Sequence, residues 1–203
     1  MDKKNSTALP QPANRAVTKK ILSDSNDDLS YWLSQPADAR LKAVEQLRVQ
    51  YSLLVQMKLT QDFQNIIQLL NSAGAEYIIA GGFAVALYGY PRYTGDIDIW
   101  INPSHENAFK VLSILYQLGY DPQDVNLEDL TTENVVVQLG YPPNRIDLST
   151  GMTGLSFESS WQNKIMMPFG GTTANFISLD DLKRNKQATA RQQDLLDLEN
   201  LPK

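Results

Sequence analysis

The chain has 203 residues, of which 42% are hydrophobic and 20% are charged, and its formal net charge at pH 7 is −5. It has no cysteine and one histidine, which excludes disulfides, thiolate zinc sites and two-histidine relays, so a bound metal ion would need carboxylate ligands. The net negative charge argues against sequence-independent binding along a nucleic-acid duplex, because such binding needs many Lys and Arg contacts to phosphate.

The N-terminal part of the chain divides into two predicted segments. Residues 1–28 are rich in Ser, Asn, Asp, Lys and Pro and have no apolar period, which predicts a flexible leader. Residues 29–58 predict a helical extension, in which Ser34-Gln35-Pro36 starts an amphipathic helix that ends near Tyr51. We expect this helix to pack its apolar side on the next domain or on a partner. Its apolar residues are Leu41, Val44 and Leu47.

Two features of the sequence bear on its compartment. The leader lacks the apolar core of a secretory signal. The longest apolar run, near residues 77–86, is far shorter than the roughly 20 residues that a membrane span needs. We therefore expect a cytoplasmic protein that does not contact a membrane.

In residues 59–203, predicted helices and strands alternate as in one folded domain. This order predicts an α+β fold, similar to α/β, with a mixed central sheet flanked by helices and preceded by the helical extension. In chain order we expect a helix capped by Thr60 and ending at Gly74, strand 76–80, helix 83–87, strand 96–101, helix 106–118, strands 135–139 and 145–148, an edge hairpin of 164–168 and 173–177, and a helical tail capped by Asp180.

The segment from residue 80 to residue 99 carries the chemistry. The first predicted strand ends in Gly81-Gly82, where a helix begins, and the absence of a Cβ lets backbone N–H groups approach a phosphate. In the next strand, Asp96 and Asp98 alternate with isoleucines, so both carboxylates leave the same face. Two carboxylates spaced in this way can share Mg²⁺ ions that also bind substrate phosphates.

Taken together, these motifs resemble those of the nucleotidyltransferase superfamily, which has the DNA polymerase beta-like fold. The signature of that family is a hydrophobic residue, Gly-Gly or Gly-Ser, a spacer, and then Asp-hydrophobic-Asp-hydrophobic. Here 13 residues separate Gly82 from Asp96. The added Pro91-Arg92-x-Thr94-x-Asp96 is similar to the bacterial branch that includes AbiEii-type toxins.

The resemblance implies roles for further residues. A third carboxylate is expected on a later strand, and Asp147, between Ile146 and Leu148, is the candidate, as a metal ligand or as the general base. Arg92 and Thr94 are expected beside the nucleotide. The resemblance also implies that Lys186 and Arg191 reach the triphosphate, which requires a break in the helix between them. Relatives commonly have glycine just before that arginine, where this chain has Ala190.

The implied activity is transfer of a nucleoside monophosphate from a nucleoside triphosphate to a hydroxyl of RNA, a protein or a small molecule, with Mg²⁺ or Mn²⁺. A role in a toxin–antitoxin system, with a cognate protein partner, is one option. The alternative is a catalytically silent nucleotide-binding or regulatory module on the same fold. A nucleotide-sugar glycosyltransferase would also use Asp-x-Asp, but it would not explain Gly81-Gly82 or the Arg92-x-Thr94 segment upstream.

Overall fold

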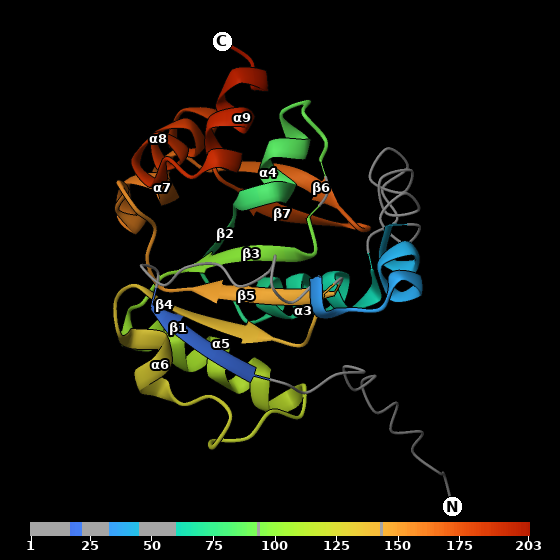
Figure 1. Ribbon diagram of the computed structural model, residues 1–203. Coiled ribbons are helices and arrows are strands. Elements are labelled where there is room, and N and C mark those ends of the chain that lie inside the picture. The colour runs from blue at the N-terminus through green and yellow to red at the C-terminus, as the bar shows by residue number, and fades with distance from the viewer. Residues whose placement is uncertain (1–16, 22–32, 45–59, 93, 143) are drawn as a thin grey trace, which may run out of the picture.

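The computed structural model describes residues 17–21, 33–44, 60–92, 94–142 and 144–203. In these residues a mixed sheet of seven strands forms the centre of the protein, in the order β1-β4-β5-β3-β2-β7-β6 (Figure 1). The pairs β3–β5 and β2–β7 are parallel and the other neighbours are antiparallel. The strands are β1 (Val17–Ile21), β2 (Tyr77–Ile79), β3 (Asp96–Ile101), β4 (Val135–Leu139), β5 (Arg145–Ser149), β6 (Ile165–Phe169) and β7 (Thr172–Phe176).

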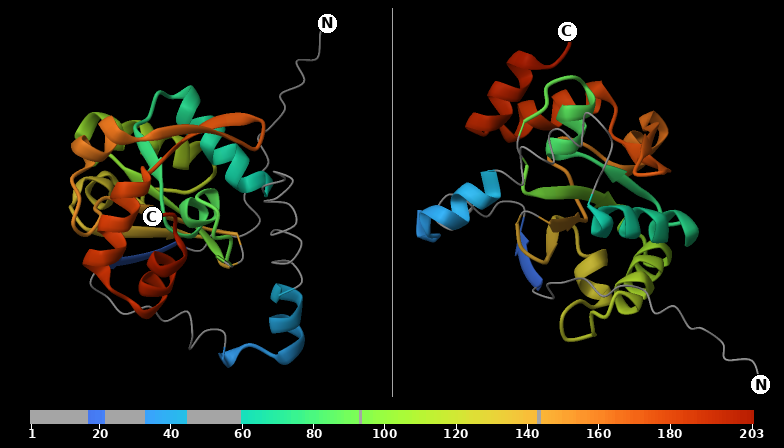
Figure 2. Two further views of the ribbon diagram at one scale, coloured as in Figure 1. Left: turned by 90° about the horizontal axis from the view of Figure 1, so that it is seen from above. Right: turned by 90° about the vertical axis from the view of Figure 1, so that its right-hand side faces the viewer.

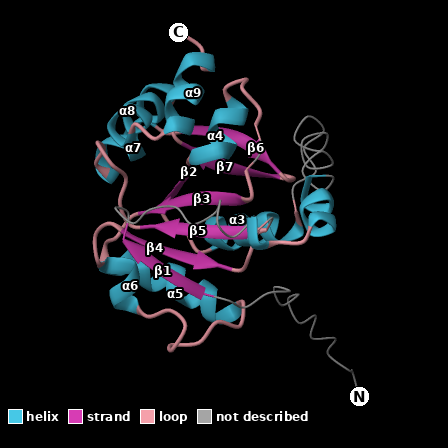
Figure 3. Cartoon of the chain, in the orientation of Figure 1, coloured by secondary structure: helices cyan, strands magenta, loops and turns pink. Residues whose placement is uncertain are grey.

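Helices cover both faces of the sheet (Figures 2 and 3). Helix α5 contacts α3 and α6 on one side, and α8 contacts α4 and α9 on the other. No helix among the described residues is both long and apolar enough to cross a membrane. The helices are α3 (Gln61–Ser72), α4 (Gly81–Leu87), α5 (His105–Gln117), α6 (Leu127–Thr131), α7 (Phe157–Asn163), α8 (Leu179–Thr189) and α9 (Gln192–Asn200).

Local sequence explains the elements that position the site. In β3 the isoleucines at positions 97 and 99 are fully buried, whereas the carboxylates at positions 96 and 98 lie on the opposite, partly exposed face. Helix α3 starts where predicted, because the Thr60 hydroxyl accepts a hydrogen bond from the Phe63 amide at 3.4 Å. Its buried face, formed by residues 63, 66, 67 and 70, follows the helical period.

Strand β1 departs from the prediction for the N-terminal part of the chain. Val17–Ile21 lie within the predicted flexible leader but form an edge strand in antiparallel register with Val135–Leu139. An edge strand needs backbone hydrogen bonds on one side only and tolerates lysine. The polar sequence Val-Thr-Lys-Lys-Ile therefore lacks the apolar-polar alternation by which a half-buried strand is predicted. The prediction of a flexible leader is wrong for these five residues.

The extension is described only in part. Residues 37–44 are helical, as predicted, and the rest of that predicted helix, up to Tyr51, lies outside the described residues. The side chains expected to pack are largely in solvent: Leu41 is 69% exposed and Val44 is 59% exposed, whereas Ala43 is buried. The boundaries at residues 28 and 58 stay predictions.

The second half of the chain follows the predicted order with three differences. The edge hairpin β6–β7 is confirmed. Helices α6 and α7 were not predicted; α7 is held by a tertiary contact, in which Phe157 packs edge-to-face on Trp100 with ring centroids 5.2 Å apart. The predicted cap Asp180 is wrong, because Ser178 caps α8 and accepts a hydrogen bond from the Asp181 amide at 3.2 Å.

A break separates the last two helices. Ala190 ends α8 in the left-handed region, at φ 47°, and Arg191 precedes the first residue of α9. The break that joint action of Lys186 and Arg191 requires is therefore present, although this chain has alanine where glycine is the usual residue.

We expect Ala190→Gly to raise the free energy of unfolding by about 0.5–1 kcal/mol, since relief of left-handed strain of about 1–2 kcal/mol exceeds the added entropy of the unfolded chain. The matched control is Ala188→Gly, an exposed position within the same helix, which should lower the free energy of unfolding by about 0.5–1 kcal/mol. Urea unfolding followed by circular dichroism measures both changes. The explanation fails if the two substitutions act in the same direction.

Candidate active site

The parallel pairing of β3 with β5 assembles the acidic face of the site. In this register Asp98 lies opposite Asp147, and Asp96 lies opposite Arg145. Residues two apart on a strand share a face, so three carboxylates and one guanidinium group come together on it. The third carboxylate is therefore located beside the other two, as the resemblance implied.

Arg145 lies among the carboxylates. Its Nε donates to Asp147 Oδ1 at 2.7 Å, one of its terminal nitrogens donates to Asp147 Oδ2 at 3.1 Å, and the same terminal nitrogen forms an ion pair with Asp96. The residue is buried. Sequence reasoning did not single out Arg145, although its position two residues before Asp147 on the same strand face was a signal that could have found it.

The acidic face lacks enough positive charge to offset its carboxylates. Burial raises the pKa of Asp98 to about 7, and repulsion from Asp96 and Asp147 acts in the same direction, while the guanidinium groups of Arg191 and Arg145 oppose it. Burial raises the pKa of Asp147 to about 6, and repulsion from Asp96 adds to this effect. A cation placed against these oxygens would stabilise their ionised forms.

The donor set fits a divalent metal ion with two protein ligands. Among the described residues no group of three acidic or histidine side chains is arranged to hold a metal ion. The oxygens of Asp147 accept hydrogen bonds from Arg145 and, at 3.0 Å, from Gln138. The oxygens of Asp96 are likewise engaged, by the Thr94 hydroxyl and by Arg145, so a divalent ion would compete with such donors at either residue. Mg²⁺ is commonly held by one or two carboxylates with substrate phosphates completing its shell, and the same-face pair Asp96 and Asp98 would supply such ligands.

The two glycines at the start of α4 allow close contact with the acidic strand. Gly81 has φ +56°, and a Cβ added to it would stand 1.7 Å from Asp98 Oδ2. A Cβ added to Gly82 would stand 2.6 Å from the Cβ of Thr94. Both contacts lie within the protein, so each glycine has a structural reason that is independent of a phosphate.

The Arg92–Thr94 segment is tied to the site at both ends. The Thr94 hydroxyl donates to Asp96 Oδ1 at 2.6 Å and fixes that carboxylate. Arg92 pairs with Asp197 of α9, with Nε 2.7 Å from Oδ1. The segment therefore connects the acidic strand to the C-terminal helix.

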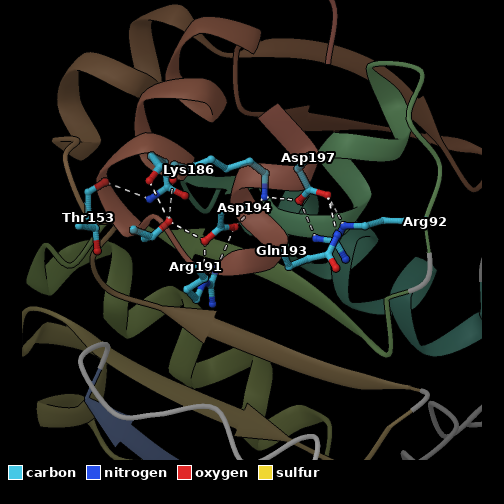
Figure 4. A network of polar contacts seen from close by, with 9 residues as sticks. Arg92, Thr153, Lys186, Arg191, Gln193, Asp194 and Asp197 are labelled. Carbon is cyan, nitrogen blue, oxygen red and sulfur yellow. Dashed lines mark hydrogen bonds and ion pairs between the residues drawn. The ribbon is translucent and has the colours of Figure 1, made fainter. Parts of the chain in front are cut away.

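Lys186 and Arg191 have different surroundings (Figure 4). Lys186 is 3% exposed, and its ammonium group lies 3.0 Å from Asp194 Oδ1 and 2.6 Å from Asp197 Oδ2. The Arg191 side chain is 63% exposed, and its Nε donates to Asp194 Oδ2 at 2.7 Å. Sequence reasoning paired Asp194 with Arg191 but did not find Asp197 or the burial of Lys186.

The comparison with family models identifies the chain as a nucleotidyltransferase. The family model described as aminoglycoside-2''-adenylyltransferase matches residues 62–201, and the chain belongs to that family. The similarity to the AbiEii-type branch is not confirmed, since the match is to a different family. A comparison with curated protein sequences gives no match.

Solved structures that resemble the chain include the following three. A protein of Thermotoga maritima classed as a nucleotidyltransferase has 18% identity over 68% of this chain and 86% of its own, with a TM-score of 0.44. The lincomycin-bound lincosamide antibiotic adenylyltransferase LnuA has 18% identity over 70% and 96%, with a TM-score of 0.42. An antigenic nucleotidyltransferase-like protein from Paracoccidioides brasiliensis has 20% identity over 72% and 73%, with a TM-score of 0.42.

We expect Gly81→Ala to displace the Asp98 carboxylate and to lower the free energy of unfolding by at least about 2 kcal/mol, because strained backbone and a steric overlap act together. Gly74→Ala is the matched control, since Gly74 has φ +60° but no atom within 4 Å of an added Cβ. It should cost only the backbone strain, about 1 kcal/mol. Thermal unfolding measures both variants, and equal losses would show that contact with Asp98 is unimportant.

The raised pKa of Asp98 predicts a pH-dependent gain in stability for Asp98→Asn. Between the unfolded-state pKa of about 4 and the folded-state pKa of about 7, unfolding releases a proton, so the wild-type free energy of unfolding falls as pH rises. Asparagine carries no such charge. The difference between the variant and the wild type should therefore grow across this window and level off above it.

Urea unfolding in the presence of EDTA at several pH values measures this difference. Glu106→Gln is the control, because Lys110 lowers the pKa of Glu106 and its contribution is already complete above the unfolded-state pKa. Its difference from wild type should stay constant in the same window. A constant difference for Asp98→Asn would contradict the assignment.

Proposed function

We propose that this protein transfers a nucleoside monophosphate from a nucleoside triphosphate to a hydroxyl of a small molecule, with Mg²⁺ or Mn²⁺. The observation that carries the proposal is the β3–β5 register, which gathers Asp96, Asp98 and Asp147 next to the Gly81-Gly82 turn. ATP is the first nucleotide to test, because the family is described as an adenylyltransferase family.

The three carboxylates have different roles in this reaction. Asp96 and Asp98 would hold the divalent ion, which when bound offsets charge on the phosphates and the leaving pyrophosphate. The acceptor oxygen bonds to the α-phosphorus as the bond from that phosphorus to the oxygen bridging the α- and β-phosphates breaks, and pyrophosphate leaves. The hydroxyl proton goes to Asp147, whose raised pKa of about 6 suits a general base near neutral pH.

Arg191 and the start of α4 lie where the nucleotide would enter. Arg191 is exposed, and its charge reaches Asp98, whose pKa it lowers. A guanidinium group binds phosphate oxygens in its planar fork. Thr94 orients Asp96 through its hydroxyl, so its effect on nucleotide binding would pass through that carboxylate.

A small molecule is the acceptor class that the chain favours. Its net charge of −5 disfavours broad contact with RNA and is compatible with a cationic, hydroxyl-bearing acceptor such as an aminoglycoside. The silent module, in contrast, would bind nucleotide without turnover. A toxin–antitoxin role would require a protein or RNA acceptor and a cognate partner.

The acceptor test uses each nucleoside triphosphate labelled at the α-phosphate, incubated with Mg²⁺ and, separately, with an aminoglycoside mixture, total RNA and lysate protein. We expect label from ATP to enter the small-molecule fraction. Label in RNA or protein would overturn the acceptor class and favour the toxin–antitoxin reading. Nucleotide binding with no transfer to any fraction would favour the silent module.

We expect Asp96→Asn and Asp98→Asn each to lower turnover by at least about tenfold, since each removes a carboxylate that would hold the divalent ion. Glu106→Gln is the control, because Glu106 is an exposed acid on α5 that pairs with Lys110. Label transfer at saturating nucleotide and metal ion measures the rates. Wild-type turnover in a folded Asp98→Asn variant would remove Asp98 from the site.

A further inference from the structure

A buried ion network joins the last two helices to the loop before β3 (Figure 4). Asp194 and Asp197 lie three residues apart on α9, on the same face of the helix, and both are buried. The ammonium group of Lys186, on α8, contacts one oxygen of each. One lysine therefore bridges two carboxylates that are almost entirely out of solvent.

Each carboxylate also accepts hydrogen bonds from one arginine. Asp194 accepts from Arg191 Nε at 2.7 Å and from the Thr189 hydroxyl at 2.7 Å. Asp197 accepts from Arg92 Nε at 2.7 Å and from a terminal nitrogen of the same arginine at 3.0 Å. The arginines belong to segments about 100 residues apart in the chain, and the lysine connects them through two short bridges.

Lys186 is the cation of this network that contacts both carboxylates. Three cations face two buried carboxylates. Burial disfavours the charged form of Asp194, yet hydrogen bonds from Arg191, Thr189 and Lys186 outweigh it and lower the pKa of Asp194 to about 2. Without the lysine each carboxylate would keep its own arginine, but the ammonium group that links the two pairs would be lost.

We propose that Lys186 is a positioning residue: through Asp194 it sets where Arg191 lies beside the acidic face, through Asp197 it sets where Arg92 lies in the loop before β3, and it does not itself contact the nucleotide. The link between Lys186 and nucleotide binding rests on the proposed function. The ion network itself is independent of that function. To reach a phosphate, the Lys186 ammonium would have to leave both acids, and they would remain buried with one cation fewer.

Arg191 is the member of the network that meets the ligand. Its side chain is exposed and extends from the network toward the sheet (Figure 4). The left-handed Ala190 turns the chain between α8 and α9, so that Lys186 and Arg191, five residues apart, both reach Asp194. On one continuous helix they would point in directions about 140° apart.

The first experiment measures the arginines directly and needs no nucleotide. In ¹⁵N-labelled protein, the Nε–Hε signals of Arg92 and Arg191 report their hydrogen bonds to the carboxylates. We expect Lys186→Met to shift both signals or to speed exchange of both protons with water. Lys183→Met is the matched control, one turn earlier on the same helix and outside the network, and it should leave both signals in place. Unchanged arginine signals in Lys186→Met would overturn the proposal.

The second experiment is a double-mutant cycle on nucleotide affinity. We expect Lys186→Met and Arg191→Ala each to weaken binding of a non-hydrolysable ATP analogue with Mg²⁺ by about tenfold, and the double variant to lose far less than the product of the two. Additive losses would mean that Lys186 contacts the nucleotide itself. Wild-type affinity in a folded Lys186→Met variant would mean that the network serves stability alone, and either result overturns the proposal.

A backup variant covers the case in which Lys186→Met does not fold. Asp197→Asn keeps Lys186 and its bridge to Asp194, so it should alter the Arg92 signal and spare the Arg191 signal. Equal changes at both arginines, or none, would contradict the two-branch network. If the wild-type protein binds no nucleotide, the proposed function fails, whereas the arginine signals still decide whether Lys186 positions them.

Discussion

Repulsion among the three carboxylates on one face of the sheet is the interaction on which the rest of the site depends. The parallel register of β3 and β5 places Asp98 beside Asp147 and leaves Asp96 one pleat away. The surrounding cations and donors offset part of that repulsion from several directions. Arg145 does so from within the sheet, Arg191 from the start of α9, and Gln138 from the neighbouring strand β4.

The cations come from elements of different kinds. Arg145 is anchored by the strand ladder, and its position is therefore as rigid as the sheet. Arg191 depends on a helix break and on Asp194, which in turn depends on Lys186. The ion network thus links the packing of α8 against α9 to the position of Arg191 beside the acidic face. Arg92 links the same packing to the loop that contains Thr94. The packing of the C-terminal helices and the electrostatics of the site therefore depend on each other.

Local patterns in the sequence predicted the parts of the protein that local physics determines. The alternation in Asp96–Ile101, the Thr60 cap and the edge hairpin are all encoded within a few residues, and each is confirmed. The family resemblance added Asp147, which no local pattern distinguishes from another acid on a strand. Its metal-binding or catalytic role stays a prediction, as does that of every other site residue.

What the sequence did not reveal depends on contacts between distant segments. Strand β1 forms by antiparallel pairing with the edge of β4, whereas its own sequence is polar and does not predict a strand. The burial of Lys186 follows from two acids on the next helix, and nothing in its immediate neighbours distinguishes it from the more exposed Lys183. Arg145 also pairs with Asp96, which lies 49 residues earlier in the chain and meets it through the parallel pairing of β3 with β5.

The contact between Gly81 and Asp98 has an evolutionary consequence. Because a side chain at position 81 would occupy the space of the carboxylate at position 98, the two positions are not independent under selection. A lineage that keeps the acid must keep the glycine, whereas a lineage that has lost the acid is released from that constraint. Paired substitution at these two positions would therefore mark descendants in which the chemistry has been abandoned while the fold persists.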